Sequence, residues 1–180
     1  MCGGKVLSVA SCVSHNFSKT IAEKIDVIAG EGVFGDAHCG ATVKHRSRVA
    51  KDPSQPNLRQ VYLLQSELFD ELAAKGFEIK PGDIGENITT CGIDLLSLPC
   101  GSQLHIGTAI LQVTGLRNPC LQLNNFRPGL MNAVLDKSAD GSLIRKSGIM
   151  TIVTASGTIQ ANDAIQVVMP IEPHIALVAV

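Results

Sequence analysis

The chain has 180 residues, of which 45% are hydrophobic, and its formal net charge is −1. This length suits one domain with a sizeable core, and the near-zero charge argues against a protein that binds nucleic acid over its whole surface. With no Trp and one Tyr, a stacking surface for single strands is not expected either. The apolar runs are too short for a membrane helix or a signal-peptide core. We therefore expect a cytoplasmic protein that binds no membrane.

The apolar segments predict a mostly-β fold with a few short helices. Stretches rich in Val, Ile and Thr alternate with Gly, Asn, Asp and Pro, which is typical of strands joined by turns. Gly107 and Thr108 separate two such stretches and predict a hairpin. A closed or nearly closed barrel would leave no strand edge free. We expect strands at Lys5–Ala10, Lys19–Ile28, Gln60–Leu64, Asn87–Thr90, Gln103–Ile106, Ala109–Leu116, Gly148–Thr154 and Ala164–Met169.

Helical patterns occur at three places. Ser66 is a candidate N-cap for a helix up to Lys75, followed by a glycine that ends it. A short helix of residues 119–126 has Asn118 as candidate N-cap and a proline at its first position. The third helix runs from about Gly129 to Lys137. The apolar tail of residues 170–180 docks either on the body of the molecule or on a second subunit of a homodimer, and the sequence does not decide between them.

Cys120 is the most informative residue. In the predicted helix it lies in the first turn, where free backbone N–H groups and the helix dipole favour an anion, and Arg117 adds a positive charge. A thiol in this place is biased towards the thiolate, which ligates metals and attacks electrophiles. The spacings of a zinc site are absent, so we expect the remaining cysteines to be reduced and to fill the core. These are Cys2, Cys12, Cys39, Cys91 and Cys100.

The segment from Lys44 to Arg59 is strongly basic. With Ser47, its side chains offer guanidinium groups and a hydroxyl suited to a phosphate or a carboxylate. The alternative is a solvated charged loop. The basic residues are Lys44, Arg46, Arg48, Lys51 and Arg59, against the single acid Asp52.

Two glycine-rich turns carry further candidates. Asp36 and His38 lie between Gly35 and Gly40 and either transfer protons or only stabilise the turn. Glu86 and Asn87 follow two glycines at a strand entrance, where they either hydrogen-bond a polar heterocycle or form a structural turn. We interpret the isolated His15, His105 and His174 as structural. Motifs of P-loop, dinucleotide-binding and serine-esterase proteins are absent.

In their order along the chain, these motifs resemble the MOSC domain, which is named after the C-terminal part of molybdenum cofactor sulfurase. The resemblance covers about residues 21–169 of a single domain spanning 1–180, and it is strongest to the small, free-standing bacterial members. The matching segments are Gly35-Asp36-Ala37-His38, His45-Arg46-Ser47-Arg48, Asn57-Leu58-Arg59-Gln60-Val61, Gly82-Asp83-Ile84-Gly85-Glu86-Asn87-Ile88 and Thr114-Gly115-Leu116-Arg117-Asn118-Pro119-Cys120.

The resemblance implies a β-barrel-like fold that binds the molybdenum cofactor. Cys120 is then the molybdenum ligand or a sulfur carrier. Cys39 departs from the family pattern and either resolves a persulfide on Cys120 or fills the core. The residues expected to contact the cofactor are Arg46, Arg48, Arg59, Glu86, Asn87, Arg117 and Asn118, with Lys44 and His45 as further candidates.

Three functions stay open at this point. The first is a molybdenum-dependent reductase of N-hydroxylated compounds such as hydroxylaminopurines. It needs an external electron donor because flavin, haem and iron–sulfur motifs are absent, and His38 or Asp36 is its candidate proton donor. The second is a sulfur carrier that takes a persulfide on Cys120 from a donor protein, or a chaperone of the cofactor. The third is a binding module without metal, in which Cys120 is an ordinary buried thiol.

Overall fold

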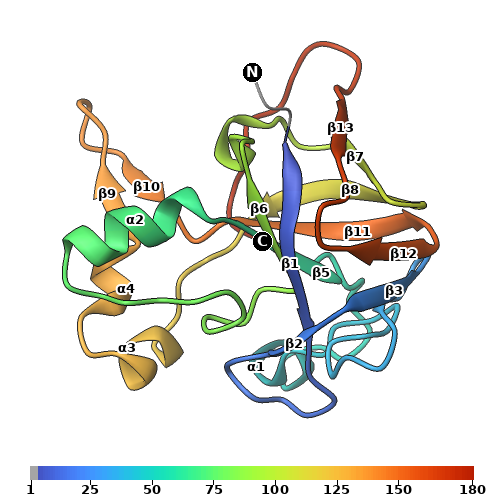
Figure 1. Ribbon diagram of the computed structural model, residues 1–180, viewed down its shortest axis with the longest axis horizontal. Helices are drawn as coiled ribbons and strands as arrows, with labels where there is room; N and C mark the ends of the chain where they lie inside the picture. The colour runs from blue at the N-terminus through green and yellow to red at the C-terminus, as the bar shows by residue number, and fades with distance from the viewer. Residues whose placement is uncertain (1–3) are drawn as a thin grey trace.

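The computed structural model describes residues 4–180, and strands dominate its fold (Figure 1). An eight-stranded sheet has the order β13-β7-β8-β11-β5-β6-β1-β2, a three-stranded sheet the order β12-β3-β4, and β9 pairs with β10. The strands are β1 (Lys5–Ser11), β2 (Thr20–Ala22), β3 (Lys24–Ile28), β4 (Gly32–Val33), β5 (Val61–Gln65), β6 (Ile88–Cys91), β7 (Gln103–Ile106), β8 (Ala109–Leu116), β9 (Leu135–Lys137), β10 (Leu143–Arg145), β11 (Ile149–Ala155), β12 (Gly157–Gln160) and β13 (Ile165–Val168). The helices are α1 (Arg46–Val49), α2 (Glu67–Ala74), α3 (Gln122–Phe126) and α4 (Leu130–Ala133), with a 3₁₀ turn at Leu95–Ser97.

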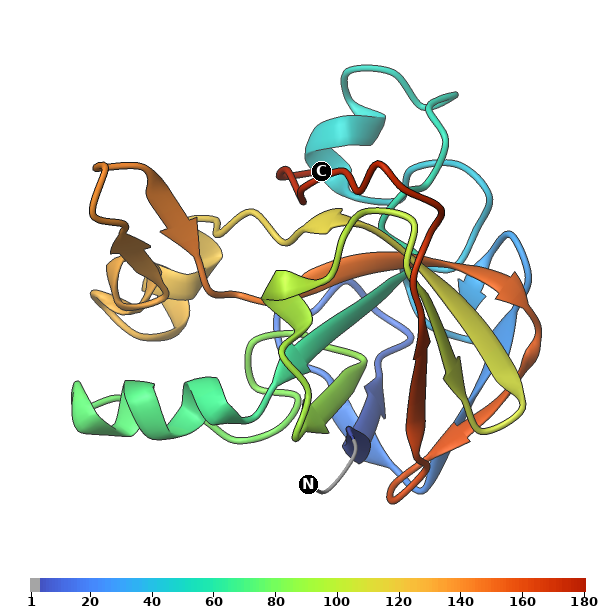
Figure 2. The ribbon, with the colours of Figure 1, turned by 90° about the horizontal axis from the view of Figure 1, so that it is seen from above.

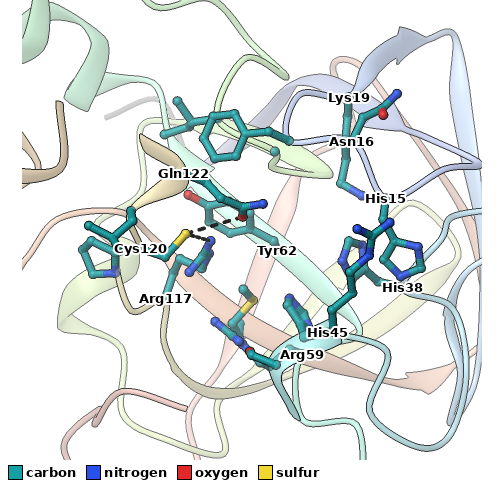
Figure 3. Close-up of a pocket in the computed structure, with 18 of the residues that line it drawn as sticks. His15, Asn16, Lys19, His38, His45, Arg59, Tyr62, Arg117, Cys120 and Gln122 are labelled. Carbon is teal, nitrogen blue, oxygen red and sulfur yellow. Dashed lines mark hydrogen bonds between the residues drawn. The ribbon is translucent and has the colours of Figure 1, made fainter. Parts of the chain in front are cut away.

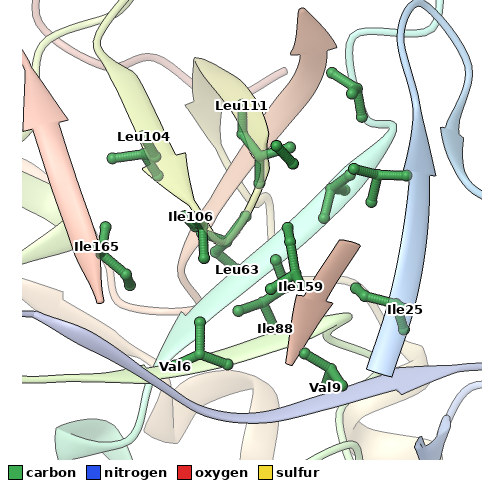
Figure 4. Packing of buried hydrophobic residues seen from close by; sticks show 14 of the residues in the cluster. Val6, Val9, Ile25, Leu63, Ile88, Leu104, Ile106, Leu111, Ile159 and Ile165 are labelled. Carbon is green, nitrogen blue, oxygen red and sulfur yellow. The ribbon is translucent and has the colours of Figure 1, made fainter. Parts of the chain in front are cut away.

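Two hydrophobic clusters form the core, and β5 contributes to both. Leu63 packs in the first cluster with side chains from both larger sheets, among them Ile25 and Ile159 (Figure 4). Leu64 points to the second cluster and packs with residues of α2 and α4. Because successive side chains of a strand alternate between its faces, a strand buried on both faces reads as the continuous apolar run that was predicted.

The helices α2, α3 and α4 and the β9–β10 pair lie together on one side of the large sheet in both views, whereas α1 lies apart from them (Figures 1 and 2). Within residues 4–180, no helix has the length and apolar character needed to cross a membrane.

The mostly-β class is confirmed, but the large sheet is not closed into a barrel. β13 and β2 end its ladder, and an isolated bridge links Lys5 of β1, the strand beside β2, to Ala164, the residue before β13. The edge strands have four and three residues. Edges this short offer little template for pairing with another chain, so closure is not needed to protect them.

Most predicted strands are confirmed, and so is the hairpin, since Ile106 pairs with Ala109. The single strand at Lys19–Ile28 is wrong. The segment divides at Glu23 into β2, which pairs with β1, and β3, which pairs with β12 and β4. The short strands β4, β9, β10 and β12 were not predicted.

The helix from Ser66 is confirmed as α2. Gly76 has φ 86°, and Phe77 N donates to Leu72 O at 2.9 Å, which is the hydrogen bond of a Schellman C-terminus. The helix predicted from Gly129 to Lys137 is wrong beyond Ala133, because the chain turns into β9 and pairs with β10.

The tail of residues 170–180 docks on the body of the molecule. Leu116 N donates to Val178 O at 2.8 Å, and Cys100 N donates to Ile175 O at 2.8 Å. A Cβ atom on Gly115 would lie 2.5 Å from Val178 O. A glycine is therefore needed in β8 for the tail to approach, and the tail ends beside the segment that leads to Cys120.

Candidate functional site

Two adjoining cavities lie where β8 leads into α3. The first has a volume of about 650 Å³ and is lined by loops after β1 and β4, by β5 and by residues around α3. The second has a volume of about 480 Å³ and is lined by α1, the segment after β8 and the end of the tail. The two cavities share the side chains of Ser47, Arg59, Arg117 and Cys120. Cys120 can therefore be reached from both spaces.

The placement of Cys120 differs from the sequence prediction. The helix α3 begins only at Gln122, with Leu121 as its N-cap residue, so Cys120 precedes the helix and does not lie in its first turn. Asn118 does not cap the helix, because its Oδ1 accepts a hydrogen bond from Arg145 Nε at 3.1 Å. The helix-dipole argument for a thiolate at Cys120 was wrong.

Arg117 is the cation nearest to the sulfur. Its Nη2 donates to Cys120 Sγ at 3.6 Å, and the thiol donates to Gln122 Oε1 at 3.6 Å (Figure 3). The guanidinium carbon of Arg117 also lies 5.6 Å from the centroid of the Tyr62 ring, a cation–π distance. Burial raises the pKa of Tyr62, so this ring is a neutral phenol. The sulfur thus lies beside a guanidinium group that an aromatic face helps to orient.

The cavities are rich in cations, and no Asp or Glu among residues 4–180 lines them. Arg46 lines the first cavity, Arg48 and Lys51 line the second, and Arg59 and Arg117 line both. In this part of the chain, none of the five belongs to an ion pair.

Arg59 is a half-buried member of this set of cations. Its burial, with the charges of Arg117 and Arg48, lowers its pKa to about 10. Its Nε is buried without a hydrogen-bond partner in the structure. Since buried donors in folded proteins are nearly always satisfied, an anion is the natural partner for this group.

Three histidines form one wall of the first cavity. The ring centroids of His15 and His38 are 5.1 Å apart, and those of His38 and His45 are 4.5 Å apart. Burial lowers the pKa of His45 to about 2, with Arg59 and His38 acting in the same direction, so this ring is neutral at physiological pH. His15, interpreted as structural from the sequence, lines the cavity. No local pattern marks it, because a contact between distant loops places it there.

Asp36 lies behind this wall and does not line either cavity. It accepts hydrogen bonds from Lys19 Nζ, Cys12 N and Asn87 Nδ2. It also accepts from the backbone N and the ring Nδ1 of His38. Burial alone would raise its pKa, but hydrogen bonds from His38 and the charge of Lys19 hold the pKa well below its usual range. Asp36 is therefore an ionised acceptor that positions its neighbours.

Glu86 and Asn87, the two candidates of the second glycine-rich turn, differ in whether they line a cavity. Glu86 is fully buried and lines neither cavity. It closes a turn by accepting from Gly82 N at 2.6 Å and Thr89 Oγ1 at 3.0 Å, and burial raises its pKa. Asn87 lines the first cavity, although its amide is engaged with Ala10 O, Asp36 and Tyr62 N.

Asn118 lines the second cavity, whereas Lys44 and Cys39 line neither. Burial raises the pKa of Cys39, which keeps it a thiol. Cys2 lies outside the described residues.

The sequence profile of the MOSC domain matches residues 30–166, which include the candidate residues from Asp36 to Cys120. The chain belongs to the MOSC domain family. His15 and Lys19, which line the first cavity, and the tail, which lines the second, lie outside the matched range. A search of curated proteins finds no match.

Solved structures of MOSC-type proteins share the fold. The YuaD protein from Bacillus subtilis is 28% identical, with a TM-score of 0.74 over 91% of this chain and 94% of that one. YiiM from Geobacillus stearothermophilus is 19% identical, with a TM-score of 0.69 over 96% of this chain and 79% of that one. YiiM from Escherichia coli is 18% identical, with a TM-score of 0.62 over 96% and 72%.

Proposed function

We propose that this MOSC protein binds the molybdenum cofactor and uses it to reduce N-hydroxylated compounds. The family is associated with this cofactor. The observation that carries the proposal is a pair of cavities without Asp or Glu in their lining, in which a thiol lies among five cations without ion-pair partners among residues 4–180.

The residues present fit the chemistry of the cofactor. Its terminal phosphate is a dianion, and guanidinium groups bind phosphate through charge-assisted hydrogen bonds; Arg59, with its unpartnered Nε, and Arg48 are suited to this role. Thiolate is a soft ligand that suits a metal already held by sulfur, and Cys120 provides it. Within residues 4–180 no group of three or more His, Cys, Asp and Glu side chains could hold a metal.

The cofactor, when bound, would supply two-electron redox chemistry. Cys120 Sγ would hold the metal, and Arg117 would orient the ligand beside it. Phe17, Ile84 and Met131 line the first cavity, where their apolar side chains exclude water and leave room for the flat part of an organic substrate. The electrons come from an external donor.

The same geometry supports a second function, that of a sulfur carrier. Cys120 is half-buried, faces both cavities and lies 3.6 Å from a guanidinium nitrogen. A persulfide on this sulfur would have room to extend and a cation to stabilise its terminal sulfur. Carrier and reductase differ in whether the bound metal takes part in turnover.

Metal analysis tests the proposal. Protein from a host that makes the cofactor is expected to contain molybdenum and a fluorescent oxidised pterin, and Cys120→Ala to lose both. The matched control is Cys91→Ala, at the end of β6 and outside the lining of both cavities, which should retain both. Molybdenum retained in Cys120→Ala refutes the ligand assignment, and wild-type protein without molybdenum refutes the proposal.

An activity assay separates the two functions. N-hydroxyadenine and a chemical electron donor should give adenine with the wild-type protein. A mass increase of one sulfur atom on Cys120, without turnover, would instead identify the carrier.

A further inference from the structure

We propose that His38 delivers protons to a substrate in the first cavity and that Asp36 is the positioning residue that fixes the His38 ring. This inference rests on the proposed function. It is carried by the buried carboxylate of Asp36, its contact with the His38 ring, and the place of that ring in the wall of the first cavity.

The carboxylate of Asp36 fixes the tautomer of His38. Its side chain is 2% exposed and it pairs with Lys19, so it is ionised and can only accept hydrogen bonds. Its Oδ1 lies 3.2 Å from His38 Nδ1 and 2.9 Å from His38 N. Nδ1 must therefore carry a hydrogen, and Nε2 is left as the nitrogen that exchanges a proton.

Of the three histidines in the cavity wall, His38 is the one whose ring contacts a carboxylate among the described residues. His45 has a pKa lowered to about 2 by burial and neighbouring cations, so it does not carry a proton near neutral pH. His15 has its Nε2 3.2 Å from Lys44 O. Among the described residues, neither of these rings contacts a carboxylate.

The ring also faces the space in which a substrate would lie. The His38 side chain is 22% exposed and lines the first cavity together with Cys120. In the view of Figure 3, the histidines and the sulfur lie on opposite sides of this space. A substrate bound between them would have its N–O group between the thiol on one side and the His38 ring on the other.

The reaction has a defined balance. Reduction of R–NHOH to R–NH₂ takes up two electrons and two protons, breaks the N–O bond and releases water. An external reductant supplies both electrons. His38 gives one proton to the leaving hydroxyl oxygen, is protonated again from solvent, and gives the second proton to the amine nitrogen.

The experiment compares His38→Gln with His174→Gln, an exposed histidine of the tail, in protein loaded with molybdenum. General acid–base catalysis typically contributes about 10²–10⁴-fold. We therefore expect His38→Gln to lower kcat by at least about 10²-fold, with KM and molybdenum content unchanged. In His38→Ala, added imidazole should restore part of the turnover. His174→Gln should match the wild type. An unchanged kcat in His38→Gln overturns the assignment.

A second readout needs no cofactor. Long-range ¹⁵N–¹H NMR of the histidine rings should show His38 with its hydrogen on Nδ1 in wild-type protein and a mixture of tautomers in Asp36→Asn. Because Asp36→Asn leaves the buried Lys19 amine without a counter-charge, the double variant Lys19→Met/Asp36→Asn is measured in parallel. In the neutral ring, a hydrogen on Nε2 in place of Nδ1 in the wild type overturns the positioning role of Asp36.

The outcomes separate this inference from the function on which it rests. Wild-type protein that contains molybdenum but turns over no N-hydroxylated compound refutes the reductase and, with it, the proton-delivery role. Turnover that survives in His38→Gln with the same KM refutes His38 alone.

Discussion

Replacing Lys19 by methionine tests how strongly the buried ion pair holds the cavity wall together. The side chains of Lys19 and Asp36 are 5% and 2% exposed, so the substitution leaves a buried carboxylate without its counter-charge. Removing one partner of such a pair typically costs about 3–5 kcal/mol. Four donors to Asp36 remain, namely Cys12 N, Asn87 Nδ2, and the backbone N and ring Nδ1 of His38. We therefore expect the lower end of this range, about 3 kcal/mol.

The loss should depend on pH. In the wild type the pKa of Asp36 is depressed, so its contribution to stability is present above the ordinary carboxyl pKa and is lost as the pH falls towards the folded-state pKa. Without Lys19 that pKa rises, and the carboxyl can become neutral at a higher pH. The free energy of unfolding of Lys19→Met should therefore differ most from the wild type at pH 7 and less at pH 4.5.

Urea unfolding at both pH values measures the effect, with a thermal melt at pH 7. A loss of about 3 kcal/mol corresponds to a fall in Tm of roughly 6–12 °C for a chain of this size. The control is Lys24→Met, an exposed residue of β3, which should change stability by less than about 0.5 kcal/mol. If both variants unfold alike at pH 7, the buried pair does not stabilise the fold and the reasoning is wrong.

Three further substitutions test separate parts of the structure. Gly115→Ala places a Cβ 2.5 Å from Val178 O, so it should cost about 1–3 kcal/mol and speed limited proteolysis of residues 170–180. Arg48→Gln removes a cation from the second cavity and should weaken pyrophosphate binding by about tenfold in calorimetry, since hydrogen bonds to charged groups contribute about 1.5–3 kcal/mol. His45→Gln removes a ring whose pKa falls to about 2 on folding. In the wild type, the unfolded ring binds a proton below its ordinary pKa and the folded ring does not, so acid favours the unfolded state. When the pH is lowered from 7 to 4.5, the free energy of unfolding should therefore fall less in the variant than in the wild type.

Each of these predictions has an outcome that contradicts it. Unchanged proteolysis in Gly115→Ala would mean that the tail is not held by its approach to β8. Pyrophosphate binding that weakens equally in Lys80→Gln, an exposed residue outside the lining of both cavities, would show an effect of net charge alone. An acid sensitivity of His45→Gln equal to that of His174→Gln would remove His45 from the proton balance of unfolding.

The sequence predicts strands best where burial leaves a clear pattern. Val61–Leu64 is apolar throughout because both faces of β5 are covered, and β8 alternates between buried and partly exposed residues over Ala109–Leu116. β9 has two polar, exposed residues after Leu135, and it forms a strand because it pairs with Leu143–Arg145. Such a strand depends on its partner, so its own residues do not predict it.

The candidate site divides in the same way. Cys120 and Arg59 were predicted from motifs, and both lie at the cavities. The local argument for Cys120 failed because Arg145, 27 residues after Asn118, binds the Asn118 side chain that was expected to cap the helix. His15 was missed because its place beside His38 results from the packing of two loops. Residues that belong to a local motif can be predicted from the sequence, whereas contacts between distant loops become known only from the folded structure.

The side chains shared by the two cavities favour one elongated ligand over two separate small anions. Arg59 and Arg117 face both spaces, so a small anion in one compartment would neutralise charge that the other compartment needs, and two separate small anions would bind less well together than apart. A single elongated molecule that occupies both cavities would contact all the guanidinium groups at once and would pass beside the sulfur of Cys120.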